Sequence, residues 1–267
     1  MSLTLQIRII FVIILSITRV IAAEGFERVG SNEQAFFTYK PIYFGATFYH
    51  TDSNNSGESK YQFSFKYELF SESSWYLAYT QKTLWSTQAD SAPIKETNYA
   101  PEFFYALEMD NEFLPLIQFG LLKHESNGEA EPGSKSWNIH YIEPIIKYEE
   151  YSFRLTLWVP FLFQSKDSAT GGTPSIFEHY GKGELEVGYM HENGDKHTLL
   201  LREGSPDGVY ALQYQWDVNL NGLFGEGGDQ SGWNTQLFLQ VFKGYGETLN
   251  TYNINTTRVI GGLSIVQ

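Results

Sequence analysis

The chain has 267 residues and no cysteine, so it is long enough for one large domain or two small ones and forms no disulfide or cysteine-ligated metal site. Its net charge of −13 at pH 7 argues against the basic surface that nucleic-acid binding requires. Aromatic residues make up 16% of the chain and the mean hydropathy is −0.29. This composition argues against membrane helices and is typical of an antiparallel β-protein, either soluble or a membrane barrel.

The first 23 residues have the pattern of a secretory signal peptide. Arg8 supplies the positive charge, residues 9–17 form an apolar run, and the small residues Ala22 and Ala23 suit cleavage. The run is shorter than the roughly 20 residues that a membrane-spanning helix needs. We therefore expect export, followed by a single barrel domain over residues 24–267 that begins with a short segment, about 24–41.

Beyond that segment, apolar and polar residues alternate with a period of two. In residues 59–70, for example, Tyr61, Phe63 and Phe65 fall on one face, whereas Gln62 and Ser64 fall on the other. Turn-rich gaps separate such stretches. The predicted strands cover residues 42–51, 59–70, 75–85, 97–110, 112–124, 134–148, 151–163, 178–191, 196–202, 207–219, 232–243 and 252–266. The sequence thus predicts about twelve strands.

The strand lengths and their connections favour a transmembrane barrel. Most strands reach the ~9–11 residues that cross a bilayer, and bacterial barrels have even strand numbers. Short gaps (71–74, 111, 149–150) alternate with long ones (88–96, 125–133, 164–177, 220–231), as periplasmic turns alternate with outer loops. A soluble sandwich or lipocalin-like barrel remains an alternative, because alternation does not say which face is inside. The chain also ends on Gln267, without the terminal aromatic residue usual in such barrels.

Candidate catalytic residues gather between positions 124 and 138. His124 and Ser126 are two residues apart at the end of a strand, so they share a face, and a base there can activate the hydroxyl. The returning strand brings Asn138 beside His124, where an amide oxygen can fix the ring tautomer. Gly128 lets the backbone approach a developing oxyanion. A solvated histidine in a hairpin loop is the plainer alternative.

Five ordered sequence blocks resemble the outer membrane phospholipase A family. They are Thr-Gln-Lys-Thr-Leu-Trp at 80–85, Glu-Thr-Asn-Tyr-Ala-Pro-Glu at 96–102, His-Glu-Ser-Asn-Gly at 124–128, Ser-Lys-Ser-Trp-Asn at 134–138, and Gly-Tyr-Gly-Glu-Thr-Leu at 244–249 together with residues 252–259. The resemblance spans residues 57–259. It implies an all-β, 12-stranded antiparallel transmembrane β-barrel of the bacterial outer membrane.

The resemblance also implies roles for individual residues. Ser126 would be the acyl nucleophile, His124 its general base, and Asn138 the residue that orients His124, with an oxyanion hole near Gly128. The reaction would be hydrolysis of phospholipid acyl esters, with phospholipase A1, A2 and lysophospholipase activity.

Calcium and dimerisation follow from the same resemblance. The family's active homodimer binds Ca2+ between subunits, and the matching positions here are Ser91, the carbonyl of Glu129, and Ser134. Hydroxyl and carbonyl oxygens suit this hard cation. The family residue at position 129 is basic, and Lys135 replaces a family arginine. Asp167 aligns with a further calcium ligand only after a one-residue shift, so it is not assigned.

Two rival functions remain open at this point. One is a non-enzymatic outer-membrane porin or binding barrel, which needs the same strands without a catalytic arrangement. The other is a lipopolysaccharide deacylase, which would pair His124 with an acid such as Glu125 or Glu143 instead of Asn138.

Overall fold

The computed structural model describes residues 36–51, 57–70, 73–87, 90–161, 174–205, 207–220 and 234–266, all of which belong to one compact unit, residues 34–267. The predicted signal peptide lies outside these residues. The elements are β1 (Phe36–Thr38), β2 (Ile42–His50), β3 (Glu58–Glu68), β4 (Trp75–Ser86), β5 (Ile94–Glu108), β6 (Leu116–Ser126), β7 (Ser136–Tyr148), β8 (Tyr151–Pro160), α2 (Pro174–Tyr180), β9 (Gly183–Met190), β10 (Lys196–Glu203), β11 (Tyr210–Asn219), β12 (Asn234–Gly244) and β13 (Thr256–Val266).

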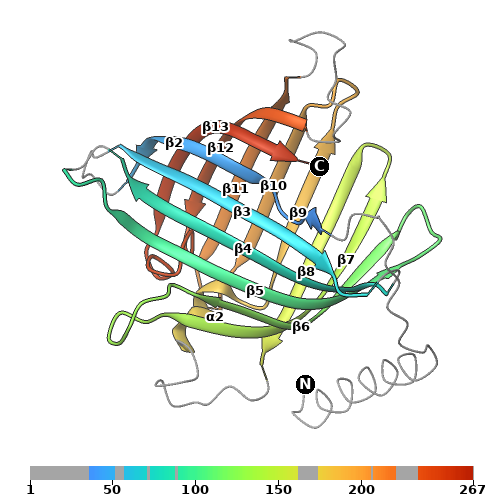
Figure 1. Cartoon of the computed structure of the whole chain (residues 1–267), viewed down its shortest axis with the longest axis horizontal. Helices are drawn as coiled ribbons and strands as arrows, with labels where there is room; N and C mark the ends of the chain where they lie inside the picture. The colour runs from blue at the N-terminus through green and yellow to red at the C-terminus, as the bar shows by residue number, and fades with distance from the viewer. Residues whose placement is uncertain are drawn as a thin grey trace. The chain divides into compact units, whose positions relative to one another are not determined.

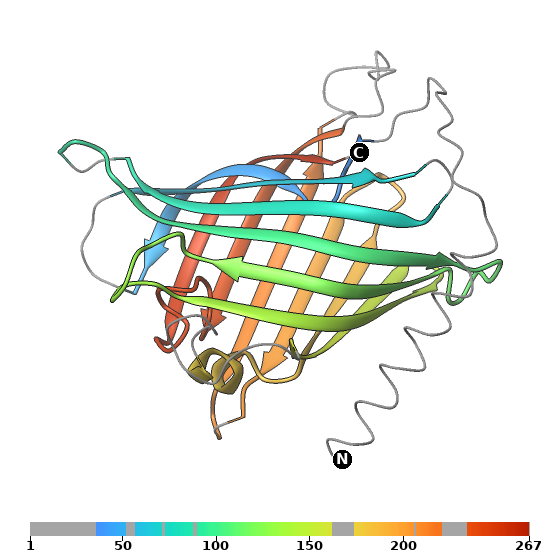
Figure 2. The same ribbon diagram turned by 60° about the horizontal axis from the view of Figure 1, so that its bottom comes forward.

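The strands form one closed antiparallel sheet (Figures 1 and 2). Each strand from β3 to β12 pairs with the next along the chain, and β13 pairs with β2 to close the ring. Both β1 and β2 pair with β3, with a register offset of two residues between them, so together they act as one strand of the wall. The described part of the chain therefore confirms the predicted twelve-stranded barrel, and the wall begins at Phe36.

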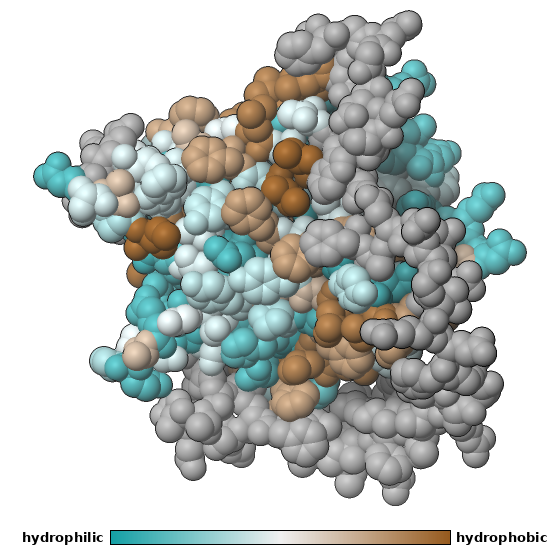
Figure 3. Space-filling model, viewed as in Figure 1, coloured by the Kyte–Doolittle hydropathy of each residue, from teal (hydrophilic) through white to brown (hydrophobic). Residues whose placement is uncertain are grey.

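The polar face of the barrel wall is inside and the apolar face is outside. Along β3, Lys60, Gln62 and Ser64 are buried, whereas Phe63 and Tyr67 are about half exposed. In a soluble barrel the polar face is outside and the apolar face inside, because polar side chains are more stable in water. The outer surface is suited to lipid, and the soluble alternative is therefore excluded. Figure 3 shows hydrophilic residues at the protruding tips and separate patches of hydrophobic residues among paler ones on the visible wall.

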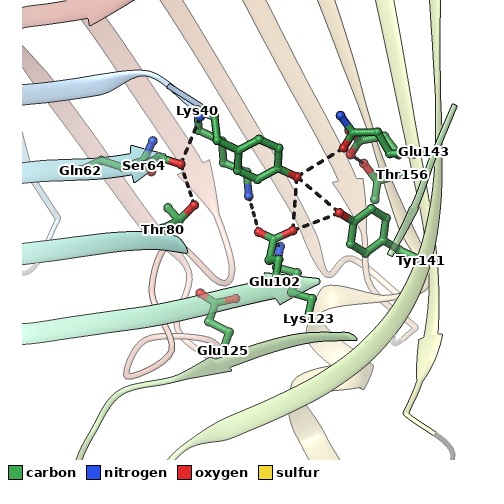
Figure 4. A network of polar contacts seen from close by, with 12 residues as sticks. Lys40, Gln62, Ser64, Thr80, Glu102, Lys123, Glu125, Tyr141, Glu143 and Thr156 are labelled. Atoms are coloured by element: carbon green, nitrogen blue, oxygen red, sulfur yellow. Dashed lines mark hydrogen bonds and ion pairs between the residues drawn. The ribbon is translucent and has the colours of Figure 1, made fainter. Parts of the chain in front are cut away.

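A network of hydrogen bonds and ion pairs lies inside the barrel (Figure 4). Near the start of β2, Lys40 Nζ lies 3.0 Å from Glu102 Oε1, and the hydroxyls of Tyr39 and Tyr141 donate to Glu102 Oε2 at 3.3 and 3.1 Å. Glu143 accepts a 2.7 Å hydrogen bond from Thr156. The contacts of Glu102 join β5 and β7 to the segment between β1 and β2, and the contact of Glu143 joins β7 to β8. Because each buried charge there has a polar partner, the wall can enclose them without an isolated charge.

The expected alternation of short and long connections holds only in part. Strands β2, β4, β6, β8, β10 and β12 end at one end of the barrel, here called the site end, and β3, β5, β7, β9 and β11 end at the opposite end. The long connection between Asn219 and Asn234 leaves from the opposite end, together with the short turn at 149–150. The prediction that every long connection shares one end is wrong at this position.

A short helix replaces the start of one predicted strand. The sequence predicts a strand over 178–191, but α2 occupies Pro174–Tyr180 and β9 begins only at Gly183. Ile176 and Tyr180 are buried in the interior cluster that also contains Trp137 and Trp158. Packing against these rings, which periodicity does not reveal, holds the helix in place. No helix in the described ranges is long and apolar enough to cross a membrane.

A one-residue bulge in β6 changes which face its side chains occupy. Gly120 pairs with Tyr141 and Lys123 with Ile139, so two residues of β6 lie opposite one residue of β7. Before the bulge, even-numbered Gln118 is buried inside; after it, even-numbered Leu122 is 38% exposed outside. An uninterrupted two-residue period would place Gln118, Gly120, Leu122 and His124 on one face, and the bulge breaks that period.

The connection between β12 and β13, residues 245–255, contributes a buried ionic group at the site end. Glu247 accepts hydrogen bonds from Lys60 Nζ at 3.0 Å and Arg258 Nε at 2.9 Å, and Arg258 also pairs with Glu58. Burial raises the pKa of Glu247, but the attraction of Lys60 and Arg258 outweighs burial and lowers the pKa to about 2. The carboxylate form is therefore the one that holds this connection against the wall.

Replacing Glu247 should destabilise the barrel in a pH-dependent way. Glu247→Gln leaves two buried cations with one carboxylate fewer, so we expect the free energy of unfolding to fall by roughly 3–5 kcal/mol at pH 7. Because the folded pKa lies below the unfolded one, the wild-type contribution is present above about pH 4.5 and is lost as the pH falls toward 2. Denaturant unfolding in lipid vesicles between pH 7 and 3 measures both effects. Exposed Glu192→Gln is the control; an equal loss in both variants would contradict the assignment.

Single cysteines can test the bulge, because the chain has none of its own. Leu122→Cys should react with a lipid-soluble maleimide in vesicles, whereas Gln118→Cys should be protected inside the barrel. Ile142→Cys, on the outer face of the neighbouring strand, is the positive control because Ile142 is 39% exposed. Without the bulge, positions 118 and 122 would share a face and react alike.

Candidate active site

The bulge in β6 places His124 and Ser126 on the outer face of the barrel. They follow Leu122 with a period of two, whereas Lys123 and Glu125 point inward. Lys123 lies 3.9 Å from buried Glu102, and Glu125 Oε2 accepts a 2.9 Å hydrogen bond from Trp137 Nε1. These inward contacts fix the rotation of the strand end, so the base and the hydroxyl both face the surrounding lipid.

Pairing with β7 brings Asn138 beside His124. The two residues are directly opposite each other, and His124 Nδ1 lies 2.7 Å from Asn138 Oδ1. Asn138 is on the outer face because Trp137 and Ile139, its neighbours along the strand, are 3% and 2% exposed on the inner one. Ser126 lies opposite Ser136 on β7 and Tyr99 on β5.

The contact with Asn138 determines which nitrogen of His124 can act as a base. An amide oxygen only accepts hydrogen bonds, so Nδ1 must carry the proton and donate it to Oδ1. Nε2 is then unprotonated in the neutral ring and can accept a proton. Ser126 carries the hydroxyl two residues further along the same face, and among the contacts of the described residues no hydrogen bond joins the two side chains. The arrangement can perform nucleophilic acyl transfer by the same logic as a serine–histidine pair.

Asn127 closes the loop that follows Ser126. Its side-chain oxygen accepts hydrogen bonds from the backbone NH groups of Glu129 (3.3 Å) and Lys135 (2.9 Å), and its amide group donates to the carbonyl of Gly133 at 2.9 Å. Its own backbone NH donates to the carbonyl of Lys135 at 3.0 Å. The loop over residues 127–135 is here called the catalytic loop. These hydrogen bonds hold its two ends together beside the candidate nucleophile.

Gly128 has a backbone conformation that only glycine adopts easily. Its φ angle is +71°, and a Cβ atom there would lie 2.6 Å from the ring of Tyr99. Gly128 follows Ser126 by two residues. Its backbone lies against the ring of Tyr99, the residue of β5 that is paired with Ser126. The backbone NH of Gly128 is the candidate donor for a developing oxyanion, because the NH groups of Asn127 and Glu129 already donate to the Lys135 carbonyl and to Asn127 Oδ1.

The candidate calcium ligands lie in two adjacent loops at the site end. Glu129 and Ser134 belong to the catalytic loop, and Ser91 is exposed in the connection between β4 and β5, with φ of +66°. Among the contacts of the described residues, none joins Ser91 to the other two. Carbonyl and hydroxyl oxygens are the donors that Ca2+ prefers, so the donor set fits the ion. Asp167 lies outside the described residues.

The structure adds residues that the motifs did not indicate. Asn250, in the connection between β12 and β13, contacts the catalytic loop, and Glu96 and Asn98 of β5 bind the same connection through its backbone. Glu96 and Asn98 are buried, although both are polar. Their place in an alternating strand could have indicated an inward position, whereas nothing in the local sequence points to the role of Asn250.

Comparisons with known proteins agree with this geometry. A family model described as Phospholipase A1 matches residues 31–265. Phospholipase A1 of Klebsiella pneumoniae is 32% identical over 200 residues, and that of Escherichia coli (strain K12) is 31% identical over 200 residues. Each match covers 70% of this chain and 61% of the relative. The chain thus spans less than two thirds of the length of these curated relatives.

Two solved structures share the fold over nearly their whole length. Outer membrane phospholipase A from Escherichia coli has a TM-score of 0.74 at 24% identity, with 89% of this chain and 94% of that chain covered. A Salmonella typhi outer membrane phospholipase dimer with bound calcium has a TM-score of 0.74 at 25% identity, with 88% and 94% covered. The chain is therefore a 12-stranded outer-membrane β-barrel that belongs to the phospholipase A1 family.

Proposed function

We propose that this protein is a calcium-dependent outer-membrane phospholipase that hydrolyses phospholipid acyl esters, with A1, A2 and lysophospholipase activity. The observation that carries the proposal is the 2.7 Å contact between His124 and Asn138 on the lipid-facing wall, with Ser126 on the same face. A substrate held in the bilayer can reach this face without entering the barrel. Membership of the phospholipase A1 family supports the same reaction.

In the acylation step, Ser126 Oγ attacks the ester carbonyl while His124 Nε2 takes the hydroxyl proton. The ester C–O bond then breaks, and His124 returns that proton to the leaving alcohol. Water next attacks the acyl-enzyme by the same route, which releases the fatty acid and restores Ser126. Asn138 keeps Nδ1 protonated throughout, so that Nε2 remains the proton carrier.

Calcium and a second subunit complete the proposed site. The carbonyl of Glu129 and the Ser134 hydroxyl of one subunit, with Ser91 of the other, would hold Ca2+. When bound, the ion would supply positive charge near the developing oxyanion. The Salmonella typhi relative is a dimer with bound calcium, which supports this arrangement. A site completed by association would keep the monomer idle in an intact membrane.

The two rival functions are less well supported. A porin needs an open lumen, but the described interior contains buried ion pairs and bulky side chains such as Phe104 and Tyr141. A deacylase with a serine–histidine–acid site needs a carboxylate beside His124. Glu125 and Glu143 both point inward, where they accept hydrogen bonds from Trp137 and Thr156. Asn138 is the side chain that contacts His124.

Loss of the nucleophile tests the proposal directly. Ser126→Ala should lower phospholipid hydrolysis in mixed micelles by ~10⁴-fold or more, because the proposed acyl-enzyme cannot form without the Ser126 hydroxyl. EDTA should abolish wild-type activity, and added Ca2+ should restore it. Ser136→Ala, the residue opposite Ser126, is the matched control and should retain most activity. Folded wild-type barrel that stays inactive in excess Ca2+ would contradict the enzyme assignment.

Gly128→Ala tests the backbone beside the nucleophile. A Cβ atom would collide with Tyr99 and strain a φ of +71°, so we expect a roughly 100-fold lower kcat through a displaced oxyanion donor. Gly208→Ala is the control: its φ is +79°, but its Cβ would meet nothing within 4 Å. A Gly128→Ala variant as active as Gly208→Ala and the wild type would contradict the assignment of an oxyanion donor to this turn.

A further inference from the structure

Asn250 stands at the junction of the barrel wall and the catalytic loop. It belongs to the connection between β12 and β13, in which Leu249 is fully buried and Tyr252 is 8% exposed. The backbone NH of Leu249 donates to Asn98 Oδ1 at 3.2 Å, and that of Asn250 donates to Glu96 Oε1 at 2.8 Å. Two inward-facing side chains of β5 therefore hold the backbone here, independently of the Asn250 side chain.

Both the oxygen and the NH2 group of the Asn250 side chain form hydrogen bonds with the catalytic loop. Its oxygen accepts from Asn127 Nδ2 at 2.9 Å and from Lys135 Nζ at 3.4 Å, and its NH2 group donates to Glu129 Oε1 at 3.1 Å. The three partners are the first, third and last residues of the loop. A side chain with one acceptor and one donor end satisfies all three, whereas a carboxylate or an alkyl group would not.

The connection that carries Asn250 is itself anchored to other strands. Glu247 binds Lys60 of β3 and Arg258 of β13, and its carbonyl accepts from Lys82 Nζ of β4 at 3.4 Å. The position of Asn250 is therefore set by strands β3, β4, β5 and β13, none of which carries the candidate nucleophile. Asn250 therefore connects these strands to the loop that follows Ser126.

We propose that Asn250 is a positioning residue that fixes the catalytic loop. Its contacts hold Glu129, whose carbonyl is a proposed calcium ligand, and Asn127, whose backbone leads directly to Gly128. The inference rests on the proposed function for its catalytic consequence. Its structural part, an ordered loop that depends on the contact between Asn250 and Glu129, does not require that the protein hydrolyse lipid.

A double-mutant cycle of Asn250→Asp and Glu129→Gln, in which each variant is measured alone and both together, isolates this contact. Asn250→Asp keeps the oxygen that accepts from Asn127 and Lys135 but replaces the donor to Glu129 with a second carboxylate. We expect residues 127–135 to exchange amide hydrogens at least about 10-fold faster and kcat to fall by about 10-fold, because like charges at this distance repel. The Ca2+ concentration for half-maximal activity should rise as well.

Adding Glu129→Gln should reverse these changes. The amide introduced at position 129 can donate to the carboxylate introduced at position 250, which restores the hydrogen bond with donor and acceptor exchanged. The double variant should therefore exchange more slowly and be more active than Asn250→Asp alone. Asn253→Asp, at an exposed position in the same connection, controls for the added charge. Asn250→Ala, which removes the contacts without adding charge, is measured alongside in case Asn250→Asp does not fold.

The outcomes separate the positioning role from general stability and from the proposed function. Unchanged exchange of residues 127–135 in Asn250→Asp and Asn250→Ala, or no recovery on adding Glu129→Gln, would overturn the inference. A general loss of stability would instead raise exchange over all strands equally, which also contradicts it. If the wild type hydrolyses no phospholipid, the exchange measurements still decide the role of Asn250, whereas the proposed function fails.

Discussion

The two-residue alternation of a closed sheet is the constraint on which the rest of this structure depends. In a barrel without edges, every side chain of a strand points either to the lumen or to the surroundings, and one inserted residue exchanges the two faces for the remainder of the strand. The bulge in β6 makes this exchange between Gly120 and Lys123. Lys123 and Glu125 thereby join the polar interior, and His124 and Ser126 come to face the lipid. The candidate site exists because of this single extra residue.

The polar interior makes that arrangement rigid. Glu102 binds Lys40 and Tyr141, and Glu247 binds Lys60 and Arg258. Two separate groups of side chains therefore join strands and connections across the lumen. Buried ion pairs contribute little net stability compared with apolar packing, but they are costly to break and specify one arrangement of their partners. Here they fix the strand ends and the connection beneath the catalytic loop. The barrel serves as a scaffold that holds three outward-facing side chains in place.

Periodicity and motif spacing predicted the barrel, its strand number and the meeting of His124 with Asn138, because these depend on local alternation and on one hairpin. They failed where long-range packing decides. The helix at Pro174–Tyr180 depends on contacts with Trp137 and its neighbours, and the faces of β6 depend on a bulge that leaves the residue types unchanged. The partners of Asn250 come from positions 96–135, more than 100 residues away in sequence, and no local pattern in the chain indicates them.

The central claim is that Ser126 is an activated nucleophile that faces lipid. A fluorophosphonate reacts covalently only with an activated serine, so intact-protein mass spectrometry with two such probes tests it most directly. In calcium-loaded vesicles, a probe with a long alkyl chain should add one adduct to the wild type at Ser126 and none to Ser126→Ala. A short, water-soluble probe should react far more slowly. Equal labelling by both probes would place the serine in water, and no adduct from either would contradict an activated nucleophile.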